Sequence, residues 1–117
     1  MASITELAEQ LGKAIAQSPQ AGRLREAAEL VRQDPEASNL LAQFRRQATE
    51  IARKEAEQKP IEPEEKRKLG DLQRRLASRE ALKKFTSAQV DYVDLMRTVN
   101  ETIYSELDQT EQAARPA

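Results

Sequence analysis

The sequence predicts an all-α protein of about five helices, a helical bundle with a long third helix and a long C-terminal helix. Charged residues make up 33% of the chain and aromatic residues only 3%, a balance that favours charged helices over strands. Apolar residues also recur every three or four positions along most of the chain, as on one face of an α-helix. The length of 117 residues fits one domain, which we place at 1–109, and residues 110–117 are expected to form a disordered tail.

Three helix starts are marked by residues that commonly cap helices. Ser3 and Glu6 have the spacing of a capping box, in which each side chain accepts a backbone N–H at the helix start. Ser18 and Asp34 each precede a proline, whose fixed φ and missing N–H suit the first helical position. These signals predict a short first helix, a second from about residue 19, and a third from residue 35 to about 58.

The second half of the chain contains one strong break and one weaker one. Pro60 and Pro63 predict a turn, because each removes a backbone donor and biases the preceding residue away from α. A fourth helix is expected from about Pro63, and near Ser78 the apolar pattern changes phase. The last helix then runs for about 30 residues, or roughly 45 Å, whereas a compact chain of this length has a radius of gyration of about 13 Å. This helix is therefore expected to project beyond a compact monomer.

Apolar residues follow an a/d-like pattern along the last helix and form what we call the seam. Its members are Phe85, Tyr92, Met96, Val99 and Ile103. An exposed apolar stripe of this length needs a partner. The seam therefore predicts a self-association surface in a homodimer or a larger homo-oligomer.

The residue types argue against catalysis and against a bound cofactor or metal. The sequence has no cysteine and no histidine, so thiol nucleophiles, Fe–S ligation and imidazole ligands are all excluded. No pair of carboxylates or glycine-rich phosphate loop stands out. We therefore expect a non-enzymatic protein. The absence of a secretory signal and of a long apolar run predicts a cytoplasmic protein with no membrane partner.

A basic stretch at 66–84 leaves a second function open. The net charge of the chain is only −1, so there is no general attraction to nucleic acid, yet Lys68, Arg75 and Arg79 lie roughly on one helical face and suit contact with phosphates. The alternative function is therefore nucleic-acid binding. The other interpretation of this stretch is a solvated face that attracts the acidic C-terminal helix of a neighbouring copy.

The order of features from residue 4 to 108 resembles the YlbF/YmcA family, including its YheA-like members. The resemblance rests on the capped starts at Ser18 and Asp34, the proline-marked turn, the break near Ser78, and the pairs Leu82-x-x-Phe85 and Val99-Asn100-x-x-Ile103. It implies a helical fold, self-association and a regulatory role through protein–protein contacts, in a bacterial complex that affects development or messenger-RNA processing. Some family members bind an Fe–S cluster through cysteines. This chain has none, so the cysteine-less YheA-like branch is the closer analogy.

Overall fold

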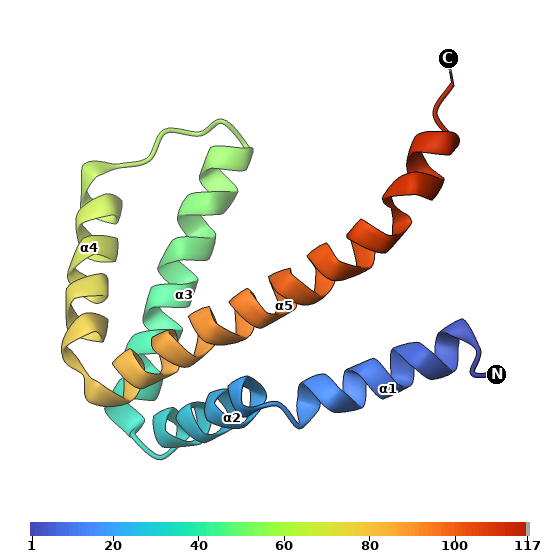
Figure 1. Ribbon diagram of the computed structural model, residues 1–117. Helices are drawn as coiled ribbons and strands as arrows, with labels where there is room; N and C mark the ends of the chain where they lie inside the picture. Colours follow the sequence, from blue (N-terminus) through green and yellow to red (C-terminus); the bar gives the residue numbers. More distant parts are fainter. Residues whose placement is uncertain (117) are drawn as a thin grey trace.

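The computed structural model describes residues 1–116 and consists of five α-helices in that range (Figure 1). They are α1 (Ile4–Ala16), α2 (Pro19–Arg32), α3 (Pro35–Ala56), α4 (Pro63–Ser78) and α5 (Glu80–Ala113). The all-α class, the five helices and the long third and C-terminal helices are confirmed. Helix α5 continues through Ala113, into the segment for which the sequence predicts a disordered tail, and residue 117 lies outside the described part. The domain limit at residue 109 therefore stays a prediction.

The first three helices begin at the capping residues that the sequence predicts. The side chain of Ser3 accepts the backbone N–H of Glu6 at 3.0 Å. Ser18 accepts the N–H of Ala21 at 3.1 Å, and Asp34 accepts that of Ala37 at 3.1 Å. Each cap satisfies one of the N–H groups that a helix start leaves without a partner. Local hydrogen bonding therefore fixes these three boundaries.

The end of α3 and the junction between α4 and α5 are built differently. Gln58 has a φ of 57°, and the N–H of Lys59 donates to the carbonyl of Lys54 at 2.8 Å. Helices often end in this way, and the left-handed position is then usually occupied by glycine. Between α4 and α5 only Arg79 departs from helical geometry, with φ −95° and ψ 126°. Ser78 is the last residue of α4, and its hydroxyl donates to the Arg75 carbonyl at 2.8 Å. Ser78 therefore does not cap α5, whose start has no side-chain cap hydrogen bond.

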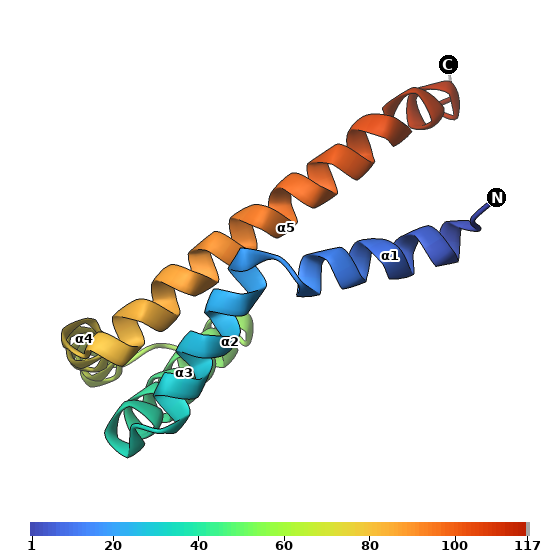
Figure 2. The ribbon, with the colours of Figure 1, turned by 60° about the horizontal axis from the view of Figure 1, so that its bottom comes forward.

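The buried core lies where α2, α3, α4 and the start of α5 meet. Helices α3 and α4 form an antiparallel pair, and α2 lies along the first half of α5 (Figures 1 and 2). The buried cluster is small and aliphatic, with partly buried apolar neighbours around it. Its buried members are Val31, Ala37, Leu40, Leu72 and Leu82. Apolar burial in this cluster therefore stabilises the junction of these four helices.

The molecule is elongated rather than globular. Its radius of gyration is 19.8 Å and its principal extents are 55 × 40 × 18 Å, against about 13 Å for the radius of gyration of a compact chain of this length. Both ribbon views show α1 and the distal half of α5 diverging from the core (Figures 1 and 2). Helix α1 buries no residue, and α5 buries only Leu82 and Ala88.

Candidate interaction surface

The five residues predicted as the association seam lie on one face of α5. Tyr92, Met96 and Val99 are half-buried, and Ile103 is 42% exposed. Phe85 lies nearer the helix start, where it packs against the buried cluster. The seam therefore passes from partial cover at the core to open solvent at the distal end of α5.

Three further apolar residues of α5 are exposed and were missed by the seam pattern. Val90, Val93 and Tyr104 are 55%, 60% and 62% exposed. Val93 follows Gln89 by four positions and precedes Met96 by three, so the helical period already places it beside the seam. The a/d pattern takes Tyr92 as the seam residue of this helical turn, and it therefore leaves out the adjacent Val93. Leu107, 42% exposed, extends the same face.

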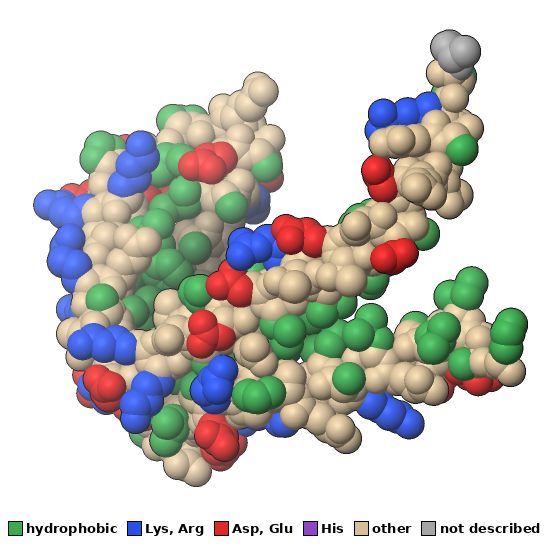
Figure 3. Space-filling model, in the orientation of Figure 1, with side chains coloured by type: hydrophobic (Ala, Val, Ile, Leu, Met, Phe, Trp, Pro, Cys, Tyr) green, Lys and Arg blue, Asp and Glu red, His purple; other side chains and the backbone are tan. Residues whose placement is uncertain are grey.

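Helix α1 presents a second exposed apolar face. Ile4, Leu7 and Leu11 are 87%, 54% and 38% exposed. In the space-filling view, apolar side chains gather in the angle between α1 and α5, where the two helices diverge (Figure 3). An isolated helix of 13 residues is marginally stable in water, so such a face ordinarily gains its stability from packing.

An apolar groove of about 700 Å³ lies between α3, α4 and the start of α5. Its apolar lining comes from all three helices and consists of Leu41, Phe44, Leu76, Ala77, Leu82 and Phe85. Arg45 and Lys83 also line it, together with polar residues that include Gln73 and Gln89. Figure 3 shows apolar side chains in this hollow between the α3–α4 pair and α5. The groove shares Phe85 with the seam, so the two surfaces are continuous.

The three cations suggested as nucleic-acid contacts are in different surroundings. Arg79 is engaged with the N-terminus of α3, because its guanidinium donates to Asp34 at 2.6 Å and pairs with Glu36 at 3.0 Å. The hydrogen bond from Arg79 and that from the backbone of Ala37 hold the pKa of the Asp34 carboxyl below its usual range. Lys68 and Arg75 lie on α4 and are exposed. Arg79 thus belongs to a link between helix ends, apart from the other two.

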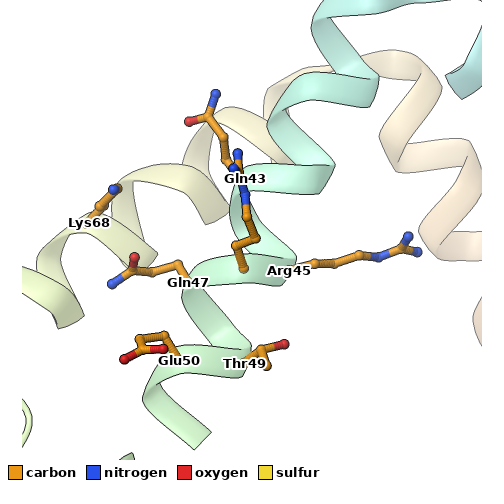
Figure 4. A pocket seen from close by; sticks show the side chains of 7 residues that line it. Gln43, Arg45, Gln47, Thr49, Glu50 and Lys68 are labelled. Atoms are coloured by element: carbon orange, nitrogen blue, oxygen red, sulfur yellow. The ribbon is translucent and has the colours of Figure 1, made fainter. Parts of the chain in front are cut away.

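Lys68 borders an open polar depression of about 760 Å³ between α3 and α4. Figure 4 shows Gln43, Arg45, Gln47, Thr49 and Glu50 of α3 on one side and Lys68 of α4 on the other. Arg46 completes the lining. Among residues 1–116, Arg45, Arg46 and Lys68 take part in no ion pair with an acidic residue of the chain. This depression is therefore lined by three cations that form no ion pair among the described residues.

Metal-binding clusters and membrane-spanning helices are both absent from the described residues. Across residues 1–116, no three acidic side chains come close enough together to hold a metal ion. No helix in the same range is long and apolar enough to cross a membrane. The absence of a bound metal or cofactor stays a prediction.

The fold and its surfaces define an elongated all-helical protein with apolar helix faces exposed to solvent. The model of the family described as "Control of competence regulator ComK, YlbF/YmcA" matches residues 4–108. The chain belongs to this regulatory family, and the resemblance found in the sequence is confirmed. It is a cysteine-less member. Comparison with curated protein sequences gives no match.

Two solved structures share the fold along nearly the whole chain. One is a protein of unknown function (DUF964) from Bacillus stearothermophilus, with a TM-score of 0.79 and 22% identity, covering 93% of this chain and 96% of that one. The other is RicA from Bacillus subtilis, solved in complex with RicF, with a TM-score of 0.70 and 21% identity, covering 92% and 95%. At these identities the likeness establishes the fold.

Proposed function

We propose that this protein is a non-enzymatic regulator that acts through protein–protein contacts and self-associates through the seam on α5. The observation that carries the proposal is the apolar face of α5, which the rest of the chain leaves partly or fully exposed from Tyr92 to Leu107. Exposed apolar faces of this extent are typical of interaction sites. Membership of a regulatory family supports the same role.

The RicA structure supports a role within a protein complex. RicA has the same fold and was solved together with a second protein, RicF. By analogy, we propose that this chain joins a bacterial regulatory complex that affects development or messenger-RNA processing. The absence of cysteine means that an Fe–S cluster held by thiolates has no part in this proposal.

A pull-down from lysate of the native cell tests the proposal when it is combined with a seam variant. The variant Met96→Asp/Val99→Asp places two charges in the apolar contact, where burial without a partner is costly. Thr98→Asp/Thr102→Asp is the matched control, because both threonines are exposed on α5 and lie away from the seam.

We expect wild-type protein and the threonine variant to retain the same proteins after nuclease treatment, and the seam variant to lose them. Light scattering should show that the seam variant also dissociates. Retention of the same proteins by the seam variant would contradict the role of the seam. Loss of all retained proteins after nuclease treatment would instead favour a nucleic-acid-dependent function.

Nucleic-acid binding remains the second candidate because Arg45, Arg46 and Lys68 all line one depression. Within the basic stretch, however, Arg67 pairs with Glu64, and Arg74 pairs with Asp71. The remaining positive charge predicts weak, non-specific binding that falls steeply with salt. A titration of RNA and DNA near physiological salt tests this, and sub-micromolar, sequence-dependent binding would favour the second candidate.

A further inference from the structure

We propose that the groove between α3, α4 and α5 receives the distal end of α5 from a second copy of this chain, in an antiparallel pair of α5 helices centred at Met96. The inference rests on the proposed self-association through the seam. It adds an orientation, a register and an occupant for the groove. Two identical helices that pair around a two-fold axis bring the same surface to both sides of the contact.

The sequence of α5 is self-complementary about Met96. In an antiparallel pair centred there, residues equally distant from Met96 in the two directions lie at the same level. Met96 then faces its own copy, and Gln89 faces Ile103 of the second copy, seven positions away on either side.

The same register brings Leu107 to the groove. Leu107 and Phe85 are each eleven positions from Met96, so Leu107 of the second copy lies level with Phe85, beside Phe44 and Leu76 of the groove lining. Leu107 is 42% exposed, and the groove is apolar and open. Each copy thus supplies the residue that covers the groove of the other.

The charges around the groove also fit the distal end of α5. Arg45 and Lys83 line the groove and form no ion pair among residues 1–116. Asp108 and Glu111 follow Leu107 on α5 and are likewise without an ion pair among the described residues. In this register Glu111 of the second copy lies level with the start of α5, near Lys83. Opposite charges therefore meet at the edge of an apolar contact, where they favour one orientation over another.

Cross-linking tests the register directly, because the chain has no cysteine and any introduced thiol is unique. With a thiol-reactive cross-linker of about 8 Å, which suits the 8–10 Å between packed helix axes, Met96→Cys should cross-link to itself. A mixture of Gln89→Cys and Ile103→Cys should also cross-link. Ile103→Cys alone should not, because its two copies lie about 21 Å apart along the helix axes. Thr98→Cys, away from the seam, is the matched control.

The possible outcomes distinguish a wrong register from the absence of self-association. Cross-linking of Ile103→Cys alone, with none between Gln89→Cys and Ile103→Cys, would show a parallel pair and overturn the proposal. Cross-linking of Met96→Cys without the mixed pair would mean that another segment, such as α1 of the second copy or a different protein, occupies the groove. That result would overturn the inference and leave self-association through the seam intact. A wild-type protein that is monomeric at the concentration used would overturn both.

Charge reversal tests the groove by a second route. Arg45→Glu/Lys83→Glu should weaken self-association about tenfold, as expected for the loss of two exposed charge pairs and the creation of like-charge contacts. Mixing this variant with Asp108→Lys/Glu111→Lys should restore most of the affinity. Lys68→Glu, a cation outside the groove, should leave the affinity unchanged. Failure of the mixture to restore association, with both variants folded by circular dichroism, would contradict the contact.

Discussion

Arg79 connects two helix ends that are far apart in the sequence. It occupies the single non-helical position between α4 and α5, and its guanidinium pairs with Asp34, which caps α3, and with Glu36. Asp34 therefore accepts bonds both from its own helix and from the α4–α5 junction. This bonding supports the angle at which α5 leaves the core, and with it the position of the seam.

Replacing Asp34 by Asn should reduce the loss of folding stability as the pH falls. The folded protein holds the pKa of Asp34 below the ordinary value for aspartate, chiefly through the hydrogen bond from Arg79. The carboxylate therefore contributes stability that is fully present above the ordinary pKa of about 3.9 and is lost as pH falls through the lower folded pKa. Urea unfolding from about pH 5 to pH 2 should show a smaller loss for Asp34→Asn than for wild type. Asp91→Asn, at an exposed position, is the control, and equal losses for wild type and Asp34→Asn would contradict the account.

Leu82 should be among the side chains on which the core depends most. It is 3% exposed and belongs to the cluster with Leu40 and Leu72. Truncating a buried leucine to alanine removes transfer free energy and leaves a cavity, so Leu82→Ala should lower the free energy of unfolding by about 2–5 kcal/mol. Chemical denaturation measures the change. Ser87→Ala, at an exposed position of the same helix, should change it by less than about 0.5 kcal/mol, and a similarly small effect at Leu82 would show that the core lies elsewhere.

At the scale of the helices, capping chemistry made three boundaries predictable from the sequence. Ser3, Ser18 and Asp34 each accept a hydrogen bond from a backbone N–H three residues ahead. The capping residue and the helix start that it fixes therefore lie within one helical turn. The end of α3 at a left-handed Gln58 carries no such signal, because glycine or asparagine ordinarily occupies that position. The start of α5 at Arg79 depends on partners from α3, which no local pattern reveals.

Gly70 lies inside α4, where glycine is unfavourable for a helix unless a neighbouring helix packs closely against it. A Cβ atom there would instead meet only the Arg74 guanidinium, at an ordinary van der Waals distance of 3.7 Å. Gly70→Ala should therefore stabilise the protein by about 0.5–1 kcal/mol, through higher helix propensity and a less flexible unfolded chain. Thermal unfolding measures this, and a lower melting temperature for Gly70→Ala would reveal a contact that is not evident in the structure.

Periodicity identified the apolar face of each helix, but it does not tell what covers that face. The pattern in α1 is as regular as that in α2, yet α1 buries no residue and α2 buries Ala21, Ala27 and Val31. Helix α2 packs against α3 and α5, whereas α1 diverges from the core (Figure 2). Exposure of Ile4, Leu7 and Leu11 therefore required the structure, as did the groove, whose lining comes from three helices.

At the scale of the whole molecule, the predicted length of the last helix had already indicated an elongated shape. A helix of 34 residues spans about 51 Å, far more than a compact domain of this size accommodates. The observed radius of gyration of 19.8 Å confirms that the chain extends well beyond its core. The seam on this helix stays a prediction, because a single chain contains no partner surface that would test it.

If the exposed seam of α5 is a contact between copies of the chain, the wild-type protein in solution must have a larger mass than one chain. Sedimentation equilibrium at micromolar concentration should give at least twice the chain mass of 13.2 kDa, or about 26 kDa for the two-fold pair. Met96→Asp/Val99→Asp should shift the mass toward a single chain, while Thr98→Asp/Thr102→Asp should not. A stable wild-type species of 13.2 kDa at that concentration would contradict the claim.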